Sequence, residues 1–459
     1  MSWKWLVAGG WWLVVCLLVS SAMASPAYRF PPPDFTDHAL PETVVPDAPS
    51  SVYDYVDLAA LAVALAVASF LALSARSRRW LFGLTVVALL WFGFWRQGCV
   101  CPIGATQHVG QALADSSFTV PLVWVGFFTL PLLVALFFGR TFCAAVCPLG
   151  AVQEVTALRP VRVPRWLEHS LGLIPFVYLG LGVLFAATSG DYIICRYDPF
   201  VAFFRLSGSV QMLIFGVSLL VIGLFVGRPY CRFLCPLGAL LGLCSRVSRS
   251  HLRIPPEECI HCRLCEDACP YGAIREPTVA LSPEDRTRGR RRLAGLIALA
   301  PVLVAAGYFF GGYLELPLSR LDYTVQLAEQ VYREEHGFTD ETTDASEAFH
   351  NTGRPPAELY AEAVERRATF ATAGGLFGGF VAIVVAVKLI HLSIRRRRDE
   401  YTPDPALCVS CGRCFWYCPP ERVRLGLIDD VREAIPAERM PEVTERQAEL
   451  AARQKGDPT

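Results

Sequence analysis

The sequence predicts a mainly α-helical protein that forms a polytopic membrane helix bundle. Hydrophobic residues make up 53% of the 459 positions and charged residues only 18%, whereas a soluble globular domain carries about 25% charged residues. Seven apolar stretches recur along the chain, and its 17 cysteines are grouped. Because 42 Lys and Arg balance 42 Asp and Glu, the basic excess that binds phosphate backbones is missing, and nucleic acid is excluded as a partner.

The first 24 residues have the pattern of an export signal. Lys4 precedes an apolar run from Leu6 to Val19, and Ala22 to Ala24 before Ser25 form a small-x-small cleavage pattern. An uncleaved anchor helix is the alternative, and both interpretations place Ser25 and the residues after it outside. The polar, proline-rich segment 25–54 is not expected to fold alone.

The seven apolar stretches are predicted to be membrane spans. A helix needs roughly 20 residues to cross ~30 Å of hydrocarbon, so the second stretch is short and is also consistent with partial insertion. The stretches lie at residues 55–75, 80–95, 119–138, 170–188, 209–226, 292–313 and 370–392.

Arginines predict the orientation, because short cytoplasmic loops collect Lys and Arg. They follow the first and third spans, precede the sixth and follow the seventh. This places the segment from Thr402 onward in the cytoplasm and the chain in a bacterial inner membrane. The arginines are Arg76, Arg78, Arg79, Arg140, Arg159, Arg162, Arg165, Arg286, Arg288, Arg290 to Arg292 and Arg395 to Arg398.

Two cysteine runs have the spacing C-x2-C-x2-C-x3-C-P of bacterial ferredoxins. A tight loop of this kind delivers three thiolates to one iron–sulfur cube, and the fourth usually crosses to a partner cube. Zinc instead prefers two separated pairs, so the prediction is two [4Fe-4S] clusters in cytoplasmic ferredoxin-like segments. The runs are Cys259, Cys262, Cys265 and Cys269 before Pro270, and Cys408, Cys411, Cys414 and Cys418 before Pro419.

The crossing rule predicts that each cube takes ligands from both runs. The two runs must then meet in space although two spans and an outer loop separate them. Ligation of one cube by each run alone remains the alternative. The first ligand set is Cys259, Cys262, Cys265 and Cys418, and the second ligand set is Cys408, Cys411, Cys414 and Cys269.

A C-x3-C-P repeat follows the third and fifth spans, once after Gly139 and once after Gly227. The spacing puts two thiols on adjacent turns of one helix face, so each copy offers half of a four-ligand site. The alternative is two buried pairs of small residues, because free cysteine packs as a hydrophobe. The predicted inner-face site, which would hold iron–sulfur or iron, consists of Cys143, Cys147, Cys231 and Cys235.

A variant copy, C-x-C-P, contains Cys99 and Cys101 and lies at the outer side, as does Cys195. These three cysteines fit either an outer redox and metal site or a disulfide with one spare thiol. Nearby, Arg196 and Asp198 are expected to form an ion pair, because lone charges near hydrocarbon are costly. Two cysteines without a companion at ligand spacing, Cys16 and Cys244, are interpreted as packing residues.

The outer loop, 314–369, is the sizeable exported segment. Apolar spacing over Asp322 to His336 and Glu358 to Arg367 predicts short amphipathic helices, as a solvated cap or as a docking surface for a partner. At another outer position, His108 either faces a quinone headgroup or is simply hydrogen-bonded.

Together, these motifs and the segment Cys195 to Phe200 resemble the membrane-bound polyferredoxin family of NosR/NirI-type proteins and the quinol dehydrogenase subunit NapH. The resemblance covers residues 80–275 and the second cysteine run. It implies electron transfer between the quinone pool or a cytoplasmic donor and a periplasmic acceptor, and it implies that the four cysteines of the inner-face site are required.

NosR-like members also carry a periplasmic flavin-binding domain before the first span, attached through a threonine in a Ser/Thr-Gly-Ala-Thr motif. Segment 25–54 is too short for such a domain, and Gly104 to Thr106 resemble that motif only within the cysteine repeat. A flavin is therefore expected only through a partner subunit.

The predicted function is that of an electron-transfer subunit of an oxidoreductase, of the quinol dehydrogenase type, that serves a periplasmic reductase or flavoprotein. A redox-sensing regulator and a metal-reducing assembly factor remain alternatives, and no catalytic residue is predicted. The expected parts are signal peptide 1–24, periplasmic segment 25–54, membrane domain 55–250, ferredoxin-like segment 251–291, helix 292–313, periplasmic loop 314–369, helix 370–394 and ferredoxin-like segment with tail 395–459.

Overall fold

The computed structural model describes most of the chain from residue 51 onward. The expected signal peptide and nearly all of segment 25–54 lie outside the described residues, as do Cys16, Cys99 and Cys101. The described residues are 51–98, 102–158, 161–254, 259–278, 283–339, 341–394, 398, 400–441 and 443–445.

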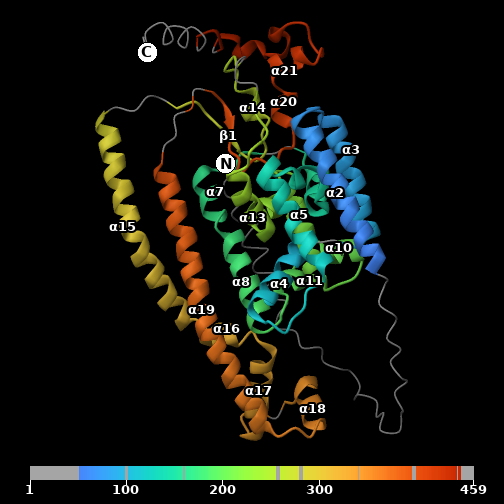
Figure 1. Cartoon of the computed structure of the whole chain (residues 1–459), viewed down its shortest axis with the longest axis vertical. Helices are drawn as coiled ribbons and strands as arrows, with labels where there is room; N and C mark the ends of the chain where they lie inside the picture. The colour runs from blue at the N-terminus through green and yellow to red at the C-terminus, as the bar shows by residue number, and fades with distance from the viewer. Residues whose placement is uncertain are drawn as a thin grey trace, which may run out of the picture.

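Helices run back and forth between two ends of the molecule (Figure 1). One end holds the cysteine runs and a small sheet, in which β1 (Ile274–Arg275) pairs antiparallel with β2 (Thr402–Pro403). We call it the ferredoxin end. The opposite end holds α17 (Tyr323–Glu335) and α18 (Asp344–Asn351).

All seven predicted stretches are helical. Four helical segments are long and apolar enough to cross a membrane, namely Val52–Leu73, Arg165–Thr188, Arg286–Tyr313 and Pro356–Ser393, and two shorter apolar helices accompany them. The mainly helical, membrane-capable fold is therefore confirmed. The helices are α2 (Ser51–Leu73), α3 (Arg78–Ala88) with η2 (Leu89–Trp95), α5 (Leu122–Phe138), α7 (Arg165–Leu171) with α8 (Ile174–Thr188), α11 (Val210–Gly223), α15 (Pro283–Tyr313) and α19 (Pro356–Ser393).

Shorter helices connect these elements and carry the repeat. The first C-x3-C-P copy occupies η3 (Phe142–Val146) and α6 (Pro148–Thr156), and the second occupies α12 (Pro229–Phe233) and α13 (Pro236–Arg246). Each proline lies at the first position of its helix, where its missing N–H costs nothing. The remaining short helices are α4 (Pro102–Ala114), α9 (Ile193–Arg196), α10 (Val201–Arg205), α14 (Leu264–Asp267), α16 (Glu315–Ser319), α20 (Arg413–Trp416), α21 (Pro419–Arg424), η4 (Val431–Ala434) and η5 (Ala437–Arg439).

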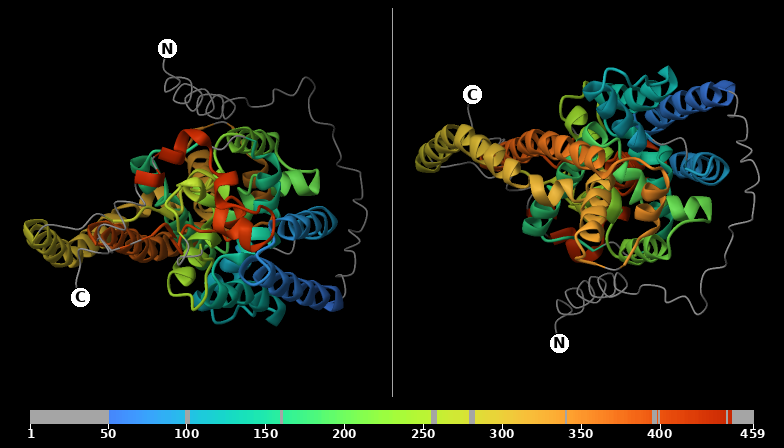
Figure 2. Two further views of the ribbon diagram at one scale, coloured as in Figure 1. Left: turned by 90° about the horizontal axis from the view of Figure 1, so that it is seen from above. Right: turned by 90° about the horizontal axis from the view of Figure 1, so that it is seen from below.

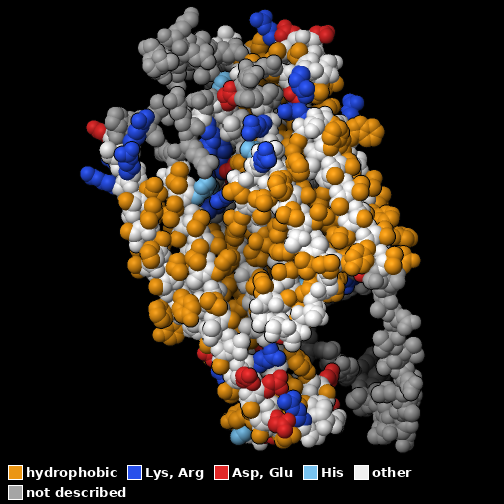
Figure 3. Space-filling view, in the orientation of Figure 1, with side chains coloured by type: hydrophobic (Ala, Val, Ile, Leu, Met, Phe, Trp, Pro, Cys, Tyr) orange, Lys and Arg blue, Asp and Glu red, His pale blue; other side chains and the backbone are white. Residues whose placement is uncertain are grey.

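Hydrophobic side chains cover the middle of the molecule in a broad band, and charged side chains gather at the two ends (Figure 3). Membrane helices turn apolar side chains outward because lipid, unlike water, imposes no cost on them. Exposed examples are Phe70 on α2, Val302 on α15 and Leu376 on α19. The surface thus resembles that of a protein embedded in a bilayer.

Helices α15 and α19 form an antiparallel hairpin at one side of the bundle, in which α19 packs against α8 and α15 lies outermost (Figure 2). Two glycine pairs let their backbones approach closely: a Cβ at Gly311 would meet the carbonyl oxygen of Gly374, and one at Gly378 would meet that of Gly307. Glycines four residues apart on facing helices are a common device of membrane helix pairs, because they allow close van der Waals packing.

Gly311→Ala is expected to weaken this hairpin, because the new methyl group collides with a backbone carbonyl that cannot move aside. We expect a cost of about 1–3 kcal/mol, measured as a lower thermal unfolding midpoint in detergent. Gly295→Ala on the same helix is the matched control, since a Cβ there meets nothing within 4 Å. Equal midpoints for both variants would contradict the close crossing.

The opposite end carries a small core of its own. Val325, Ala328 and Val331 of α17 pack with Phe349 and Leu359. The predicted helix at 322–336 is thus confirmed as α17. The segment 358–367, expected to be a separate short helix, is instead the start of the 38-residue α19, because no proline or glycine interrupts it before the span.

Candidate metal centres

The two cysteine runs adopt the same backbone path. Left-handed φ angles occur at His261 (56°) and Arg263 (63°) in the first run and at the matching Ser410 (55°) and Gly412 (77°) in the second. A left-handed conformation costs roughly 1–2 kcal/mol for a residue other than glycine, and such strain is kept where the surroundings impose it. Both loops are therefore wound in the same way around their cysteines.

The first ligand set comes together at the ferredoxin end. Burial, and then the neighbouring thiols of Cys262, Cys259 and Cys418, raise the pKa of the Cys265 thiol. The same four cysteines line one small cavity, together with Tyr401. Backbone N–H groups of His261 and Tyr401 donate to Cys259, that of Leu264 to Cys262 and that of Glu421 to Cys418.

The second ligand set lies beside the first. Burial, and then the thiols of Cys408, Cys411 and Cys269, raise the pKa of Cys414, with a smaller contribution from Cys265 of the first set. Backbone N–H groups of Ser410 and Arg413 donate to Cys408 and Cys411. Cys269 thus accompanies the second run and Cys418 the first, which is the crossed grouping.

The inner-face cysteines also come together, and the two repeat copies contact each other reciprocally. Arg228 of the second copy lies against Gly150 of the first, and Arg140 of the first lies against Gly238 of the second. A Cβ at Gly150 would lie 3.1 Å from Arg228 Nη1, and one at Gly238 would lie 3.2 Å from Arg140 Nη2. Reciprocal contacts of this kind are typical of two halves related by a twofold axis.

Each sulfur of the inner-face site accepts a hydrogen bond. Backbone N–H groups of Gly238 and Gly150 donate to Cys235 and Cys147, in matching positions of the two copies. The side chains of Gln153 and Arg140 donate to Cys231 and Cys143, with donor–sulfur distances of 3.3 and 3.8 Å. Cys147 has the other three thiols as its electrostatic neighbours.

Three buried thiols and the half-buried thiol of Cys231, each with an N–H donor, fit iron–sulfur ligation, because hydrogen bonds to the sulfurs tune the potential of such clusters. Among the described residues, no three Cys, His, Asp or Glu side chains form a compact group that could hold a single ion. A [4Fe-4S] cube does not need such a compact group, since each of its four irons takes only one thiolate.

Glu154 of α6 binds the ferredoxin segments to the membrane domain. Its carboxylate accepts from Arg78 (3.2 Å), Arg228 (3.2 Å), Arg413 (2.9 Å) and the Tyr271 hydroxyl (2.9 Å). Burial alone would raise the pKa of Glu154, but the three guanidinium groups lower it from 4.5 to about 2. A charge network that the sequence analysis missed thus joins both cysteine runs to the repeat.

Two arginines of the repeat fix the order of the three groups. Arg140 donates to the carbonyl of Ala406 (2.9 Å), two residues before Cys408, and also reaches Cys143. Arg228 has Cys231 and Cys411 among its electrostatic neighbours. The second ligand set therefore lies next to the inner-face site, and the first ligand set lies beyond it.

At the predicted outer side, Cys195 lies against α4. Its N–H donates to Gln107 Oε1 (3.3 Å), and a Cβ at Gly104 would be 3.1 Å from its sulfur. The expected ion pair of Arg196 with Asp198 is absent from the described residues. Asp198 is buried and accepts from the Phe200 N–H, and Arg196 lies over the Tyr197 ring. The prediction of this pair was wrong because the carboxylate caps a local turn.

His108 is hydrogen-bonded and Cys244 is a packing residue, which for each is the simpler of the roles considered from the sequence. His108 shares a hydrogen bond with the Tyr192 hydroxyl (3.2 Å) and lies among aromatic rings, including that of Trp124. Cys244 packs at the edge of the main hydrophobic core.

Comparisons with known proteins agree with this chemistry. Two families, both described as 4Fe-4S binding domain, match residues 120–167 with 210–255 and residues 252–275. Protein NirI of Paracoccus denitrificans is 32% identical over 133 residues, which are 28% of this chain and 19% of NirI. YccM of Escherichia coli, named for electron transport, is 30% identical over 118 residues, which are 24% of this chain and 33% of YccM.

The matched region thus spans a third or less of each of these two relatives. No solved structure matches the chain. Over these segments the chain is thus similar to 4Fe-4S binding domains, to NirI and to YccM, in agreement with the resemblance to NosR/NirI-type polyferredoxins.

Proposed function

We propose that the protein carries electrons across a bacterial inner membrane through three sulfur-ligated centres. The observation that carries this proposal is the spatial order of the three cysteine groups. The first ligand set is followed by the second, and the second lies next to the inner-face site in the bundle. The first and second ligand sets hold [4Fe-4S] clusters in the crossed arrangement, and the inner-face site holds a further iron–sulfur or iron centre. When bound, these centres supply one-electron redox chemistry.

The chain's own residues hold and shield the centres. Cys265, Cys414 and Cys147 are each less than a tenth exposed, which keeps water from the ligating sulfurs. Arg140 and Arg228 place cationic charge between the second ligand set and the inner-face site. Positive charge beside a cluster favours its reduced, more negative state, so these arginines tune the electron path.

The proposed topology has seven spans, with the ferredoxin end in the cytoplasm. Arg76, Arg78 and Arg162 lie at that end and contact the cysteine-run segments. This agrees with the tendency of Lys and Arg to stay on the cytoplasmic side. The domain boundaries expected from the sequence are proposed with one change, since α19 begins at Pro356.

A bilayer with ~30 Å of hydrocarbon is too wide for one efficient electron step. Tyr178 of α8 lies between the inner-face site and the outer end, since its electrostatic neighbours include Cys235, Cys195 and Asp198. An acceptor at the outer side would therefore receive electrons near Cys195. A quinone or cytoplasmic donor and a periplasmic reductase or flavoprotein are the proposed exchange partners.

Iron and sulfide analysis tests the proposal. Anaerobically purified protein is expected to contain about twelve irons per chain, or about eight if the inner-face site is empty. Cys231→Ser is expected to remove only the iron that the inner-face site binds. Cys244→Ser is the control, because Cys244 belongs to none of the three cysteine groups. If dithionite-reduced membranes that contain the protein show no iron–sulfur signal by electron paramagnetic resonance, the proposal is wrong.

A further inference from the structure

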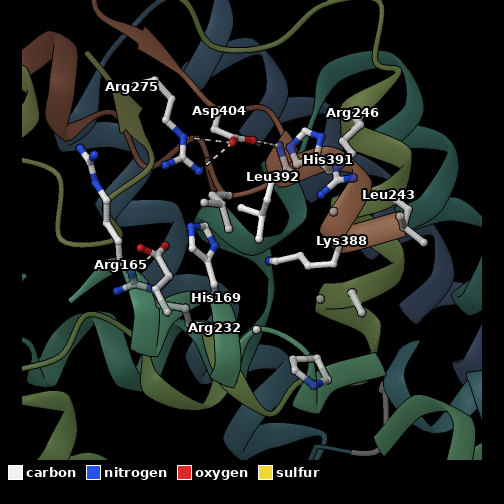
Figure 4. Close-up of a pocket in the computed structure, with 18 of the residues that line it drawn as sticks. Arg165, His169, Arg232, Leu243, Arg246, Arg275, Lys388, His391, Leu392 and Asp404 are labelled. Atoms are coloured by element: carbon white, nitrogen blue, oxygen red, sulfur yellow. Dashed lines mark hydrogen bonds and ion pairs between the residues drawn. The ribbon is translucent and has the colours of Figure 1, made fainter. Parts of the chain in front are cut away.

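A cavity of about 420 Å³ opens near the ferredoxin end, beside the inner-face site, whose Cys231 is one of its lining residues. Helices α7, α8, α12, α13 and α19 form its walls with residues of both ferredoxin-like segments. Figure 4 shows basic side chains around it, with Lys388 reaching across toward His169. The volume is in the range of sites that bind small ligands.

Every acidic side chain in this cavity already has a partner. Glu168 pairs with Arg232 (2.9 Å), Asp404 with Arg275 (3.0 Å) and Glu276 with Arg165. Further cations line the wall, and no ion pair neutralises Lys388 or Arg246 within the described part of the chain. The cavity therefore carries net positive charge.

Arg232 adds an independent sign of an anionic ligand. Its side chain is only 8% exposed, yet Nε and Nη1 have no hydrogen-bond partner among the described residues. A buried donor without an acceptor is costly. Because Arg232 lines the cavity, a small turn of its side chain would bring these N–H groups to an acceptor bound there. The third nitrogen of Arg232, Nη2, already pairs with Glu168. A phosphate group has several acceptor oxygens and can therefore accept from the remaining N–H groups.

The cavity also has an apolar side toward the bilayer. Leu243, Leu392 and Ile394 line it and are 45%, 44% and 46% exposed. Lys388 belongs to a membrane helix, where an ionisable side chain is costly and marks a functional site. Basic pockets between membrane helices on the cytoplasmic side suit anionic headgroups.

We propose that this cavity binds a phosphate group carried by an anionic phospholipid. The headgroup contacts Arg232, Lys388 and Arg246, and the acyl chains leave along Leu243 and Leu392. The site does not depend on the electron-transfer proposal. A free phosphate ion shares the headgroup chemistry but would leave the apolar side without a role.

Lipid binding can be measured by native mass spectrometry of the full chain with added phosphatidylglycerol or phosphatidylcholine. One phosphatidylglycerol is expected to bind per chain in preference to phosphatidylcholine. In the double variant Lys388→Gln with Arg246→Gln, binding should weaken about twenty-fivefold, since each basic residue contributes about a factor of five. Arg249→Gln is the control, because Arg249 is exposed and does not line the cavity.

A parallel arm measures binding of inorganic phosphate by equilibrium dialysis. Binding of phosphatidylglycerol that the double variant weakens, and that Arg249→Gln leaves unchanged, supports the proposal. Binding of inorganic phosphate alone would overturn the lipid assignment. Equal lipid binding by wild type and double variant, or no preference over phosphatidylcholine, would overturn the site itself.

Discussion

Glu154→Gln is expected to destabilise the folded protein by about 3 kcal/mol and to loosen both ferredoxin-like segments. The change leaves the buried guanidinium of Arg228 without a counter-charge and weakens the contacts of Arg78 and Arg413. Removing one partner of a buried ion pair costs this much because the other charge stays buried. Thermal unfolding in detergent at neutral pH, followed by iron retention, measures the effect.

The same carboxylate predicts an acid limit to stability. Because its pKa is lowered from 4.5 in the unfolded chain to about 2 in the fold, its stabilising effect is complete above pH 4.5 and is lost as the pH falls toward 2. The unfolding midpoint of the wild type should therefore fall below pH 4.5 more steeply than that of Glu154→Gln.

Glu358→Gln provides the matched control. Its carboxylate pairs with Arg354 on the surface, where both side chains are well exposed, so the loss should stay within about 0.5 kcal/mol. If Glu154→Gln proved no more harmful than Glu358→Gln, Glu154 would not join the segments to the membrane domain.

The crossed ligand sets predict which fourth cysteine ligates the cube of the second run when the other cube has been removed by mutation. In a background of Cys262→Ala with Cys265→Ala, one cube is lost under either arrangement, and the cube of the second run remains. Adding Cys269→Ala should then remove about four further irons, because Cys269 lies with the second ligand set. Adding Cys418→Ala should leave the iron content unchanged.

Linear ligation predicts the reverse, with the further loss on Cys418→Ala and none on Cys269→Ala. Iron analysis and the cluster spectrum of the two triple variants therefore distinguish the arrangements directly. Both variants carry the same number of substitutions, so each serves as the control for the other.

Local patterns predicted the helices well, and the structure brings together the cysteines that the spacing groups. An apolar stretch is recognised from consecutive residues, and the spacing of Cys259 to Cys269 already predicts a tight loop. Both features can therefore be predicted from residues that are close together in the sequence. The meeting of the two runs followed from the crossing rule, and the pairing of β1 with β2 shows how the fold brings the segments together.

Long-range charge contacts could not be predicted in this way. Arg78 and Glu154 are 76 positions apart, and Glu154 and Arg413 are 259 apart, so no local spacing reveals them. One signal was available, because Arg140 and Arg228 occupy the same position in the repeat. The Asp198 prediction failed for a related reason, since a turn within three residues competed with the expected ion pair.

The reciprocal contacts of Arg140 with Gly238 and of Arg228 with Gly150 have an evolutionary meaning. Two identical subunits that shared one centre on their dyad would leave this pattern after fusion of their genes. Neither half could then assemble that centre by itself. Later divergence would have been free to attach Arg140 to the second ferredoxin-like segment at Ala406 and to place Arg228 over the Tyr271 ring of the first. Such divergence turns a symmetric centre into a directional one.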